Sequence, residues 1–199
     1  MSTSCVATLF YIHGFNSSPD SYKAELSRRW LAEYRPDISF VCPFLSPFPD
    51  QAMAQLQQEV ANIEGSMAFV GSSMGGFYAT YLAEQYQCKA VLVNPAVRPW
   101  LGRKYLLGEQ ANYHTGEVCF IEPKHLEQLQ AFDVAEISRP EHFQVLLQTG
   151  DEVLDYRMAE DKYSACQLTV ENGGDHSFIG FEQHLPSITA FLFDDETLS

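Results

Sequence analysis

A chain of 199 residues with 46% hydrophobic and 19% charged residues can bury a substantial core, which excludes a disordered protein. One continuous sheet can serve this length, so we expect a single domain over residues 1–199. The net charge of −14 at pH 7 argues against a nucleic-acid partner, because such binding needs Lys and Arg to neutralise phosphates. The same charge argues against contact with an anionic membrane surface.

The compartment is predicted from the amino-terminal segment and the cysteines. Residues 1–9 lack the basic region and the long apolar region of an export signal, and no stretch approaches the roughly 18 apolar residues that span a bilayer. The cysteines are odd in number and widely spaced, which fits neither a disulfide framework nor a zinc site. They are Cys5, Cys42, Cys88, Cys119 and Cys166. We therefore expect a cytoplasmic protein with reduced thiols.

The first half of the chain alternates strands with helices. Residues 6–12 form a continuous apolar run, which is typical of a strand buried on both faces. Residues 21–34 carry apolar side chains at helical spacing until Pro36 stops the helix. The alternation continues with a strand at 38–42, a helix at 50–64, a strand at 67–70, a helix that runs from after Ser73 to Tyr86, and a strand at 90–93.

The second half interrupts this alternation once. Residues 98–140 contain no clear strand and are longer than an ordinary connection between a helix and a strand. We interpret them as a lid-like insertion over an active site. The alternation then resumes with a strand at 143–148, a helix at 156–163, a strand at 167–170 and a helix at 185–193. This order predicts a three-layer α/β fold, with a mainly parallel sheet of about six strands and helices on both faces.

The motif G-x-S-x-G centres on Ser73, between the apolar strand at 67–70 and the helix that follows. A serine in a tight turn from strand to helix needs small neighbours, which Gly71 and Gly75 supply, and the turn exposes its hydroxyl. The motif alone is weak, because glycine and serine are common and a simple turn has the same pattern. Its position after a strand and before a helix favours a nucleophile.

The acid and the base of a catalytic triad follow Ser73 in the chain order that this motif requires. Asp151 comes directly after the strand at 143–148, and His176 lies on a glycine-containing loop after the strand at 167–170. Asp155 is expected to cap the next helix, and Glu152 is expected to be a solvated charge. The alternatives for Asp151 and His176 are an ordinary turn aspartate and an ordinary loop histidine.

Further residues are expected around the nucleophile. His13, Gly14 and Phe15 end the first strand, so the backbone N–H groups of Phe15 and Met74 are expected to form the oxyanion hole. The substrate pocket is expected to involve His13, which props this loop, together with Arg98 and Trp100. Arg98 could contact an anionic substrate group; the alternative is a solvated arginine on the insertion.

The residues around these positions resemble the α/β-hydrolase superfamily, and within it the small YqiA/YcfP-like esterase family. The blocks that carry the resemblance are residues 11–18, 70–79, 93–96, 150–155 and 173–178. The resemblance implies a minimal sheet without a leading antiparallel hairpin, and hydrolysis of esters or thioesters with no metal and no organic cofactor. It gives least guidance over residues 98–140.

The expected function is therefore that of a serine esterase or thioesterase that acts on a small-molecule acyl ester or thioester through an acyl-enzyme intermediate. The sequence carries no signal for an oligomeric state. Two alternatives remain at this point. One is a triad enzyme that does not cleave esters, such as a lyase or a C–C bond hydrolase, since one scaffold supports several reactions. The other is a non-catalytic binding protein on the same fold, although binding needs none of the three triad side chains.

Overall fold

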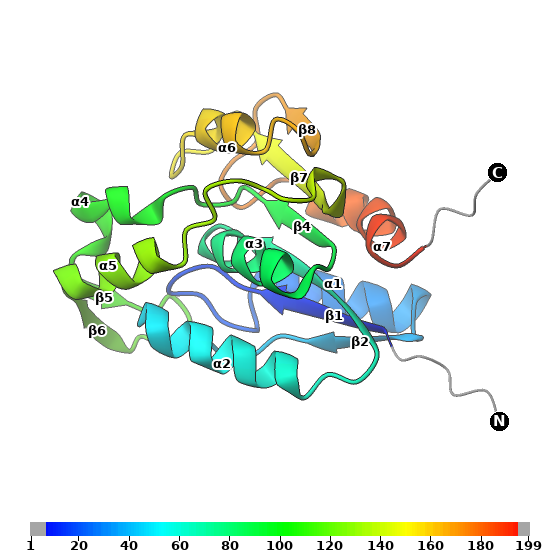
Figure 1. The fold of residues 1–199 in the computed structure, drawn as a ribbon, viewed down its shortest axis with the longest axis horizontal. Helices are drawn as coiled ribbons and strands as arrows, with labels where there is room; N and C mark the ends of the chain where they lie inside the picture. The colour runs from blue at the N-terminus through cyan, green and yellow to red at the C-terminus, as the bar shows by residue number, and fades with distance from the viewer. Residues whose placement is uncertain (1–6, 195–199) are drawn as a thin grey trace.

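The computed structural model describes residues 7–194 of the chain. Its main feature is a six-stranded sheet, in which every adjacent pair of strands is parallel, in the order β2-β1-β3-β4-β7-β8 (Figure 1). The strands are β1 (Ala7–Ile12), β2 (Ile38–Val41), β3 (Ser66–Ser72), β4 (Ala90–Val93), β7 (Phe143–Gln148) and β8 (Gln167–Glu171). The sheet and its six strands are as the sequence predicts.

Helices cover both faces of this sheet, which gives the three layers (Figure 1). One face is covered by α2 (Pro49–Ala61), α3 (Met74–Tyr86) and α6 (Tyr156–Lys162), and the other by α1 (Tyr22–Tyr34) and α7 (Leu185–Phe193). In β1, Phe10 and Ile12 pack under α2 and α3, whereas Leu9 and Tyr11 pack toward α1 and α7. Alternate residues of one strand thus bury both faces, which explains the continuous apolar runs.

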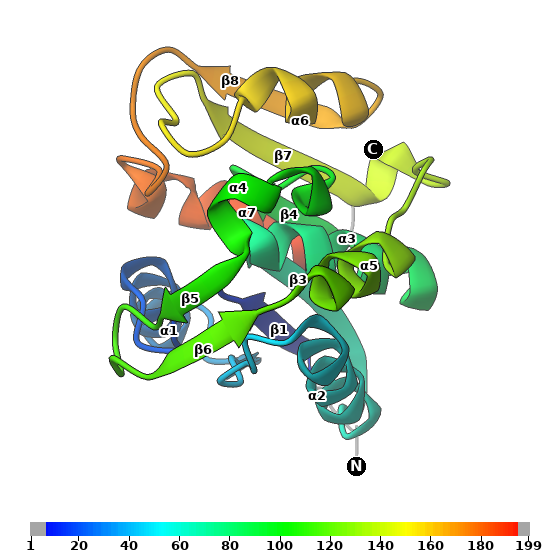
Figure 2. The ribbon, with the colours of Figure 1, turned by 90° about the vertical axis from the view of Figure 1, so that its left-hand side faces the viewer.

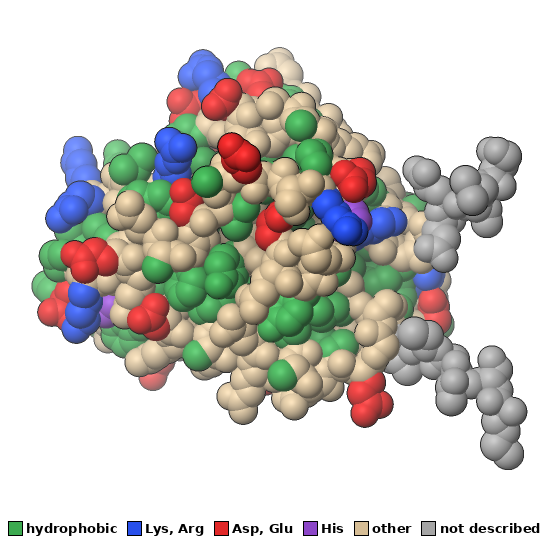
Figure 3. Space-filling model, in the orientation of Figure 1, with side chains coloured by type: hydrophobic (Ala, Val, Ile, Leu, Met, Phe, Trp, Pro, Cys, Tyr) green, Lys and Arg blue, Asp and Glu red, His purple; other side chains and the backbone are tan. Residues whose placement is uncertain are grey.

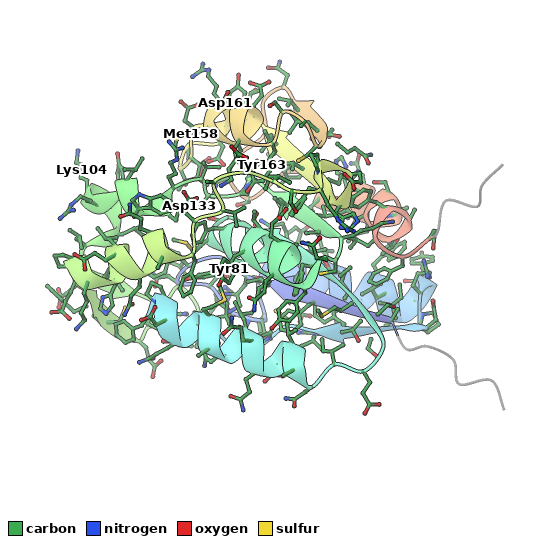
Figure 4. The ribbon with its side chains drawn as sticks, in the orientation of Figure 1. Tyr81, Lys104, Asp133, Met158, Asp161 and Tyr163 are labelled. Atoms are coloured by element: carbon green, nitrogen blue, oxygen red, sulfur yellow. The ribbon has the colours of Figure 1, made fainter. Side chains whose placement is uncertain are left out.

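Two tyrosines help to hold the helices of the first face together. The hydroxyl of Tyr163, directly after α6, lies 2.8 Å from the hydroxyl of Thr80 on α3, and both side chains are buried. Tyr81, also on α3, meets the ring of Phe132 edge-on. Figure 4 labels Tyr81 and Tyr163 on the same side of the sheet. On the surface of this face, charged side chains of both signs lie between apolar patches (Figure 3).

Residues 98–140 differ in one respect from the sequence prediction, which placed no strand there. The structure has a two-stranded antiparallel hairpin, β5 (Gly108–Ala111) with β6 (Val118–Ile121). The prediction was wrong because the sequence of β5, Gly-Glu-Gln-Ala, carries neither β-branched nor aromatic residues. The segment also contains η1 (Pro99–Leu101), α4 (Arg103–Leu106), α5 (Pro123–Ala131) and η2 (Pro140–His142), and η3 (Phe181–His184) precedes α7.

The hairpin lies beyond the carboxyl end of β1 and is attached to the loop that follows this strand (Figure 2). The backbone N–H of Tyr113 donates to the carbonyl of Asn16 at 2.8 Å, and the side chain of Asn112 donates to the carbonyl of Ser17 at 3.0 Å. Asn16 in turn donates to the side chain of Gln110 at 3.2 Å. These bonds fix the hairpin beside the end of the sheet where the site residues lie.

None of the helices within residues 7–194 is both long enough and apolar enough to cross a lipid bilayer.

Candidate active site

Ser73 stands at the junction between β3 and α3 with a backbone φ of 56° and ψ of −122°. Such a conformation is strained for a residue with a side chain, and strain of this kind persists only where surrounding bonds enforce it. The N–H of Ser73 donates to the carbonyl of Val93, and its own carbonyl accepts from the N–H groups of Gly76 and Ala96. The bend therefore holds the Ser73 hydroxyl out at the carboxyl end of the sheet.

The structure brings together the three residues predicted as a triad. His176 Nε2 lies 3.0 Å from Ser73 Oγ, and His176 Nδ1 lies 2.8 Å from Asp151 Oδ2. With its proton on Nδ1 and directed at the carboxylate, the imidazole presents a lone pair to the serine hydroxyl. This arrangement lets the histidine take a proton from Ser73 as the oxygen attacks an electrophile.

The Asp151 carboxylate is buried, with 2% of its side chain exposed, and is held by its own loop. Its Oδ1 accepts the backbone N–H groups of Val153 at 2.9 Å and Leu154 at 2.8 Å. Burial on its own would raise the pKa of Asp151, but the hydrogen bonds from His176 and from this loop outweigh it and lower the pKa below the usual 3.8. The carboxylate is therefore ionised where it orients the imidazole.

A pair of buried amides, Asn94 and Gln148, holds the loop that carries His176. Gln148 Oε1 accepts the N–H groups of Asp175 at 3.1 Å and Ile179 at 2.9 Å, and its amide nitrogen donates to the Ile179 carbonyl. Asn94 donates to the Asp175 carbonyl at 3.0 Å and accepts the N–H of Gln148. The ends of β4 and β7 thus fix the backbone on both sides of His176.

Two charged residues also reach this loop. Lys23 on α1 donates to the Ser177 carbonyl at 2.8 Å, and burial lowers the pKa of this lysine to about 8 although the neighbouring Asp175 and Asp151 carboxylates oppose the shift. Glu152 accepts the backbone N–H of His176 at 3.0 Å, so this exposed carboxylate has a specific partner that the sequence did not predict. Asp155 caps α6 through the N–H of Arg157, as predicted.

The predicted oxyanion-hole residues, Phe15 and Met74, flank the serine. A Cβ added to Gly14 would lie 3.4 Å from Ser73 Cβ, so the loop after β1 runs directly beside the nucleophile. Met74 is the first residue of α3, where the N–H groups lack helical partners. Among the hydrogen bonds of the described residues, none uses the N–H of Phe15 or Met74 as a donor. Both groups thus remain the predicted donors of an oxyanion hole.

A cavity of about 340 Å³ has Gly14, Phe15 and Met74 among its lining residues. His13 also lines it and props its wall: the Nδ1 atom lies 2.9 Å from the Gly14 carbonyl, and Nε2 accepts the N–H of Leu45 at 3.2 Å. Burial lowers the pKa of His13, so its imidazole is neutral near pH 7.

The other two predicted pocket residues lie elsewhere. Trp100 packs edge-on against Phe77 of α3, with ring centroids 6.1 Å apart. Arg98 precedes η1 in a left-handed conformation, with a φ of 49°. Neither residue is among the described residues that line the cavity. Across residues 7–194, no three His, Cys, Asp or Glu side chains form a group able to hold a metal ion.

A model of one protein family matches this chain over nearly its whole length. The family is described as "Uncharacterised protein family (UPF0227)", and the match covers residues 8–193.

Several solved structures resemble the chain, all at low sequence identity. Est1E from Butyrivibrio proteoclasticus, solved with ferulic acid bound, is 12% identical, with 94% of this chain and 88% of that chain covered and a TM-score of 0.74. Alpha/beta hydrolase domain-containing protein 10 from mouse is 13% identical, with coverages of 91% and 87% and a TM-score of 0.72. The esterase domain of a Rhodothermus marinus protein is 15% identical, with coverages of 96% and 88% and a TM-score of 0.69. The likeness establishes the α/β-hydrolase fold.

Proposed function

Because the chain belongs to the UPF0227 family and adopts the α/β-hydrolase fold, we propose that it is a serine hydrolase that cleaves carboxylic esters or acyl thioesters. The observation that carries the proposal is the hydrogen-bonded series from Asp151 through His176 to Ser73, with the serine on a strained bend. The names of the similar structures, which include an esterase domain and an alpha/beta hydrolase domain-containing protein, support the same reaction class.

The first half of the reaction transfers the acyl group to Ser73. A serine hydroxyl is a poor nucleophile at neutral pH, so His176 accepts its proton as Oγ attacks the carbonyl carbon. Asp151 stabilises the imidazolium that forms. The N–H groups of Phe15 and Met74 donate to the tetrahedral oxyanion, and each such donor contributes on the order of 3 kcal/mol to transition-state stabilisation. The imidazolium then protonates the leaving alcohol or thiol.

The second half hydrolyses the acyl-enzyme. His176, again neutral, takes a proton from a water molecule as its oxygen attacks the acyl carbon, and then returns a proton to Ser73 Oγ as the ester bond to the enzyme breaks. The carboxylic acid leaves, and no cofactor is needed in either half. We also propose a cytoplasmic location, because the four described cysteines, Cys42, Cys88, Cys119 and Cys166, are free thiols. Cys5 lies outside the described residues.

The first test replaces the nucleophile. Ser73→Ala is expected to lower kcat/KM at least about 10⁴-fold on a panel of nitrophenyl esters and acyl-coenzyme A thioesters, because no other hydroxyl within residues 7–194 is hydrogen-bonded to His176 Nε2. Labelling by a fluorophosphonate should also be lost, while the melting temperature stays close to that of the parent.

The matched control is Ser187→Ala, which removes an exposed hydroxyl on α7 and should leave both readouts unchanged. Activity retained in Ser73→Ala would overturn the proposal. A parent protein that is labelled at Ser73 but turns over none of the panel would point instead to a triad enzyme that does not cleave esters.

A further inference from the structure

We infer that the cavity beside Phe15 and Met74 binds the acyl part of the substrate, and that this acyl group is uncharged, apolar and of medium size. The inference rests on the proposed function. It adds two points, namely which part of the substrate binds in the cavity and what the chemical character of that part is. It is carried by three features of the cavity: where its walls come from, what its polar side chains already bind, and how large it is.

The origin of the walls separates the acyl side from the leaving-group side. His176 must protonate the leaving group, so the leaving group lies toward the loops after β7 and β8, which carry Asp151 and His176. None of the described residues that line the cavity comes from these loops. The lining comes instead from the end of β1, the loop between β2 and α2, the start of α3 and the β5–β6 hairpin. The cavity therefore lies on the acyl side of the substrate's carbonyl group, opposite the leaving group.

The walls are mostly apolar. Six of the apolar lining residues surround the space, and they are Phe44, Leu45, Phe48, Met74, Tyr78 and Val118. Leu45, Met74 and Tyr78 are themselves buried in the main core, which makes this part of the wall rigid. An alkyl or aromatic acyl group would thus lose water contacts and gain packing contacts along most of its length.

Four of the polar lining side chains, those of His13, Asn16, Ser46 and Asn112, already have partners within the protein. Ser46 donates to Gln51, Asn112 donates to the Ser17 carbonyl, and both nitrogens of His13 lie within hydrogen-bond distance of backbone groups. None of the described lining residues is Lys or Arg, and one of them, Glu117, is acidic. A carboxylate on the acyl group would therefore meet no cation and would be repelled.

The volume sets the size of the group. A cavity of about 340 Å³ lies near the lower end of the range for small-molecule sites. With about 30 Å³ for each water-sized group, it accommodates about ten non-hydrogen atoms. Acetyl leaves most of this space empty, and octanoyl fills it. Hexadecanoyl exceeds it.

The experiment measures kcat/KM for nitrophenyl acetate, octanoate and hexadecanoate, and for an ester whose acyl chain is about as long as octanoate but ends in a carboxylate. The parent protein is expected to prefer octanoate to acetate at least about tenfold, and to turn over the anionic ester at least about tenfold more slowly than octanoate. A flat profile across the neutral esters, or equal turnover of the anionic ester, would overturn the inference.

Two variants test the cavity itself. Val118→Trp places a larger ring at the cavity from an exposed strand position, and should lower kcat/KM for octanoate about tenfold more than kcat/KM for acetate. Phe120→Trp is the matched control, because Phe120 lies on the same strand, is equally exposed and is outside the lining; its profile should match the parent. An unchanged octanoate rate in Val118→Trp would contradict the inference.

Phe44→Ala changes the cavity in the opposite direction and does not depend on the hairpin. Phe44 is 43% exposed, so its removal leaves the main core intact and enlarges the cavity. We expect hexadecanoate to gain relative to octanoate at least about threefold. No gain would count against the inference. Failure of the inference is distinguishable from failure of the proposed function, because a protein that is labelled at Ser73 and cleaves acetate keeps the function whatever its chain-length profile.

Discussion

At the scale of single residues, the site depends on the Asp151 carboxylate, which is buried and accepts several hydrogen bonds. Asp151 accepts hydrogen bonds from His176 and from the N–H groups of Val153 and Leu154. Asp151→Asn keeps the size of the side chain but removes the charge that stabilises the imidazolium and selects the tautomer. We expect kcat/KM to fall about 10⁴-fold with little change in structure, measured on the best nitrophenyl ester.

The same variant has a signature in stability against pH. Because the pKa of Asp151 is lower in the folded protein than its ordinary 3.8, its ionisation adds stability above about pH 4, and this contribution is lost as the pH falls through the folded value. The difference in free energy of unfolding between the parent and Asp151→Asn should shrink over that acidic range. Asp161→Asn, at an exposed position on α6, is the control and should leave activity unchanged. If the difference in free energy of unfolding between the parent and Asp151→Asn does not vary with pH, the lowered pKa of Asp151 is refuted.

The residues of the site differ in how far the sequence could predict them. Ser73, Asp151 and His176 could be named because each follows a strand and their order is fixed by the fold. Gln148 and Lys23 could not, since a glutamine that ends an apolar strand and a lysine on a surface-facing helix are ordinary residues. Their roles depend on partners 27 to 154 positions away, which only the folded chain brings near.

At the scale of elements, α3 packs unusually close to β1, which allows the serine bend to lie beside the loop after β1. A Cβ on Gly75 would collide with the backbone carbonyl of Ile12, so only glycine fits there. Gly75→Ala should destabilise the protein by about 3 kcal/mol, because the colliding atoms are backbone and cannot rotate away. Urea unfolding followed by circular dichroism measures this loss.

Gln58→Ala, at an exposed position on α2, is the control and should change the free energy of unfolding by no more than about 0.5 kcal/mol. If Gly75→Ala unfolds at the same urea concentration as the parent, the close packing of α3 on β1 is refuted.

The elements also divide by how well sequence patterns identify them. The six strands of the main sheet and the helices α1, α2, α3, α6 and α7 are confirmed. The strands β1, β3, β4 and β7 are mostly buried, and strands buried on both faces leave continuous apolar runs. The β5–β6 hairpin was missed because β5 carries no β-branched or aromatic residue, so the apolar run of β6 has no recognisable partner strand in the sequence. Its position is fixed by bonds of Asn16 and Asn112 that no local pattern encodes.

At the scale of the whole molecule, the triad spans parts of unequal stability. Ser73 follows the central strand β3, which is mostly buried. His176 follows β8, which is half-exposed and, among the strands of residues 7–194, lies at the edge of the sheet beside β7. Edge strands with few buried contacts open more easily than central ones. We therefore expect activity to be lost at a lower urea concentration than the far-ultraviolet circular dichroism signal.

Hydrogen exchange provides an independent measure, and amide protection should be weaker in β8 than in β3. Coincident loss of activity and helical signal, with equal protection of both strands, would mean that the sheet opens as a single unit.

The cavity walls and the triad loops come from different segments of the chain, which affects how the substrate specificity of such a protein can evolve. In the proposed mechanism the ends of β3, β7 and β8 carry the chemistry, whereas the segments around β1, β2 and the hairpin supply most of the cavity lining. A substitution in the lining can thus change which compound is accepted while proton transfer continues unaltered. Duplicated copies of such a gene could adopt new metabolites through a few surface-accessible changes, without passing through an inactive ancestor.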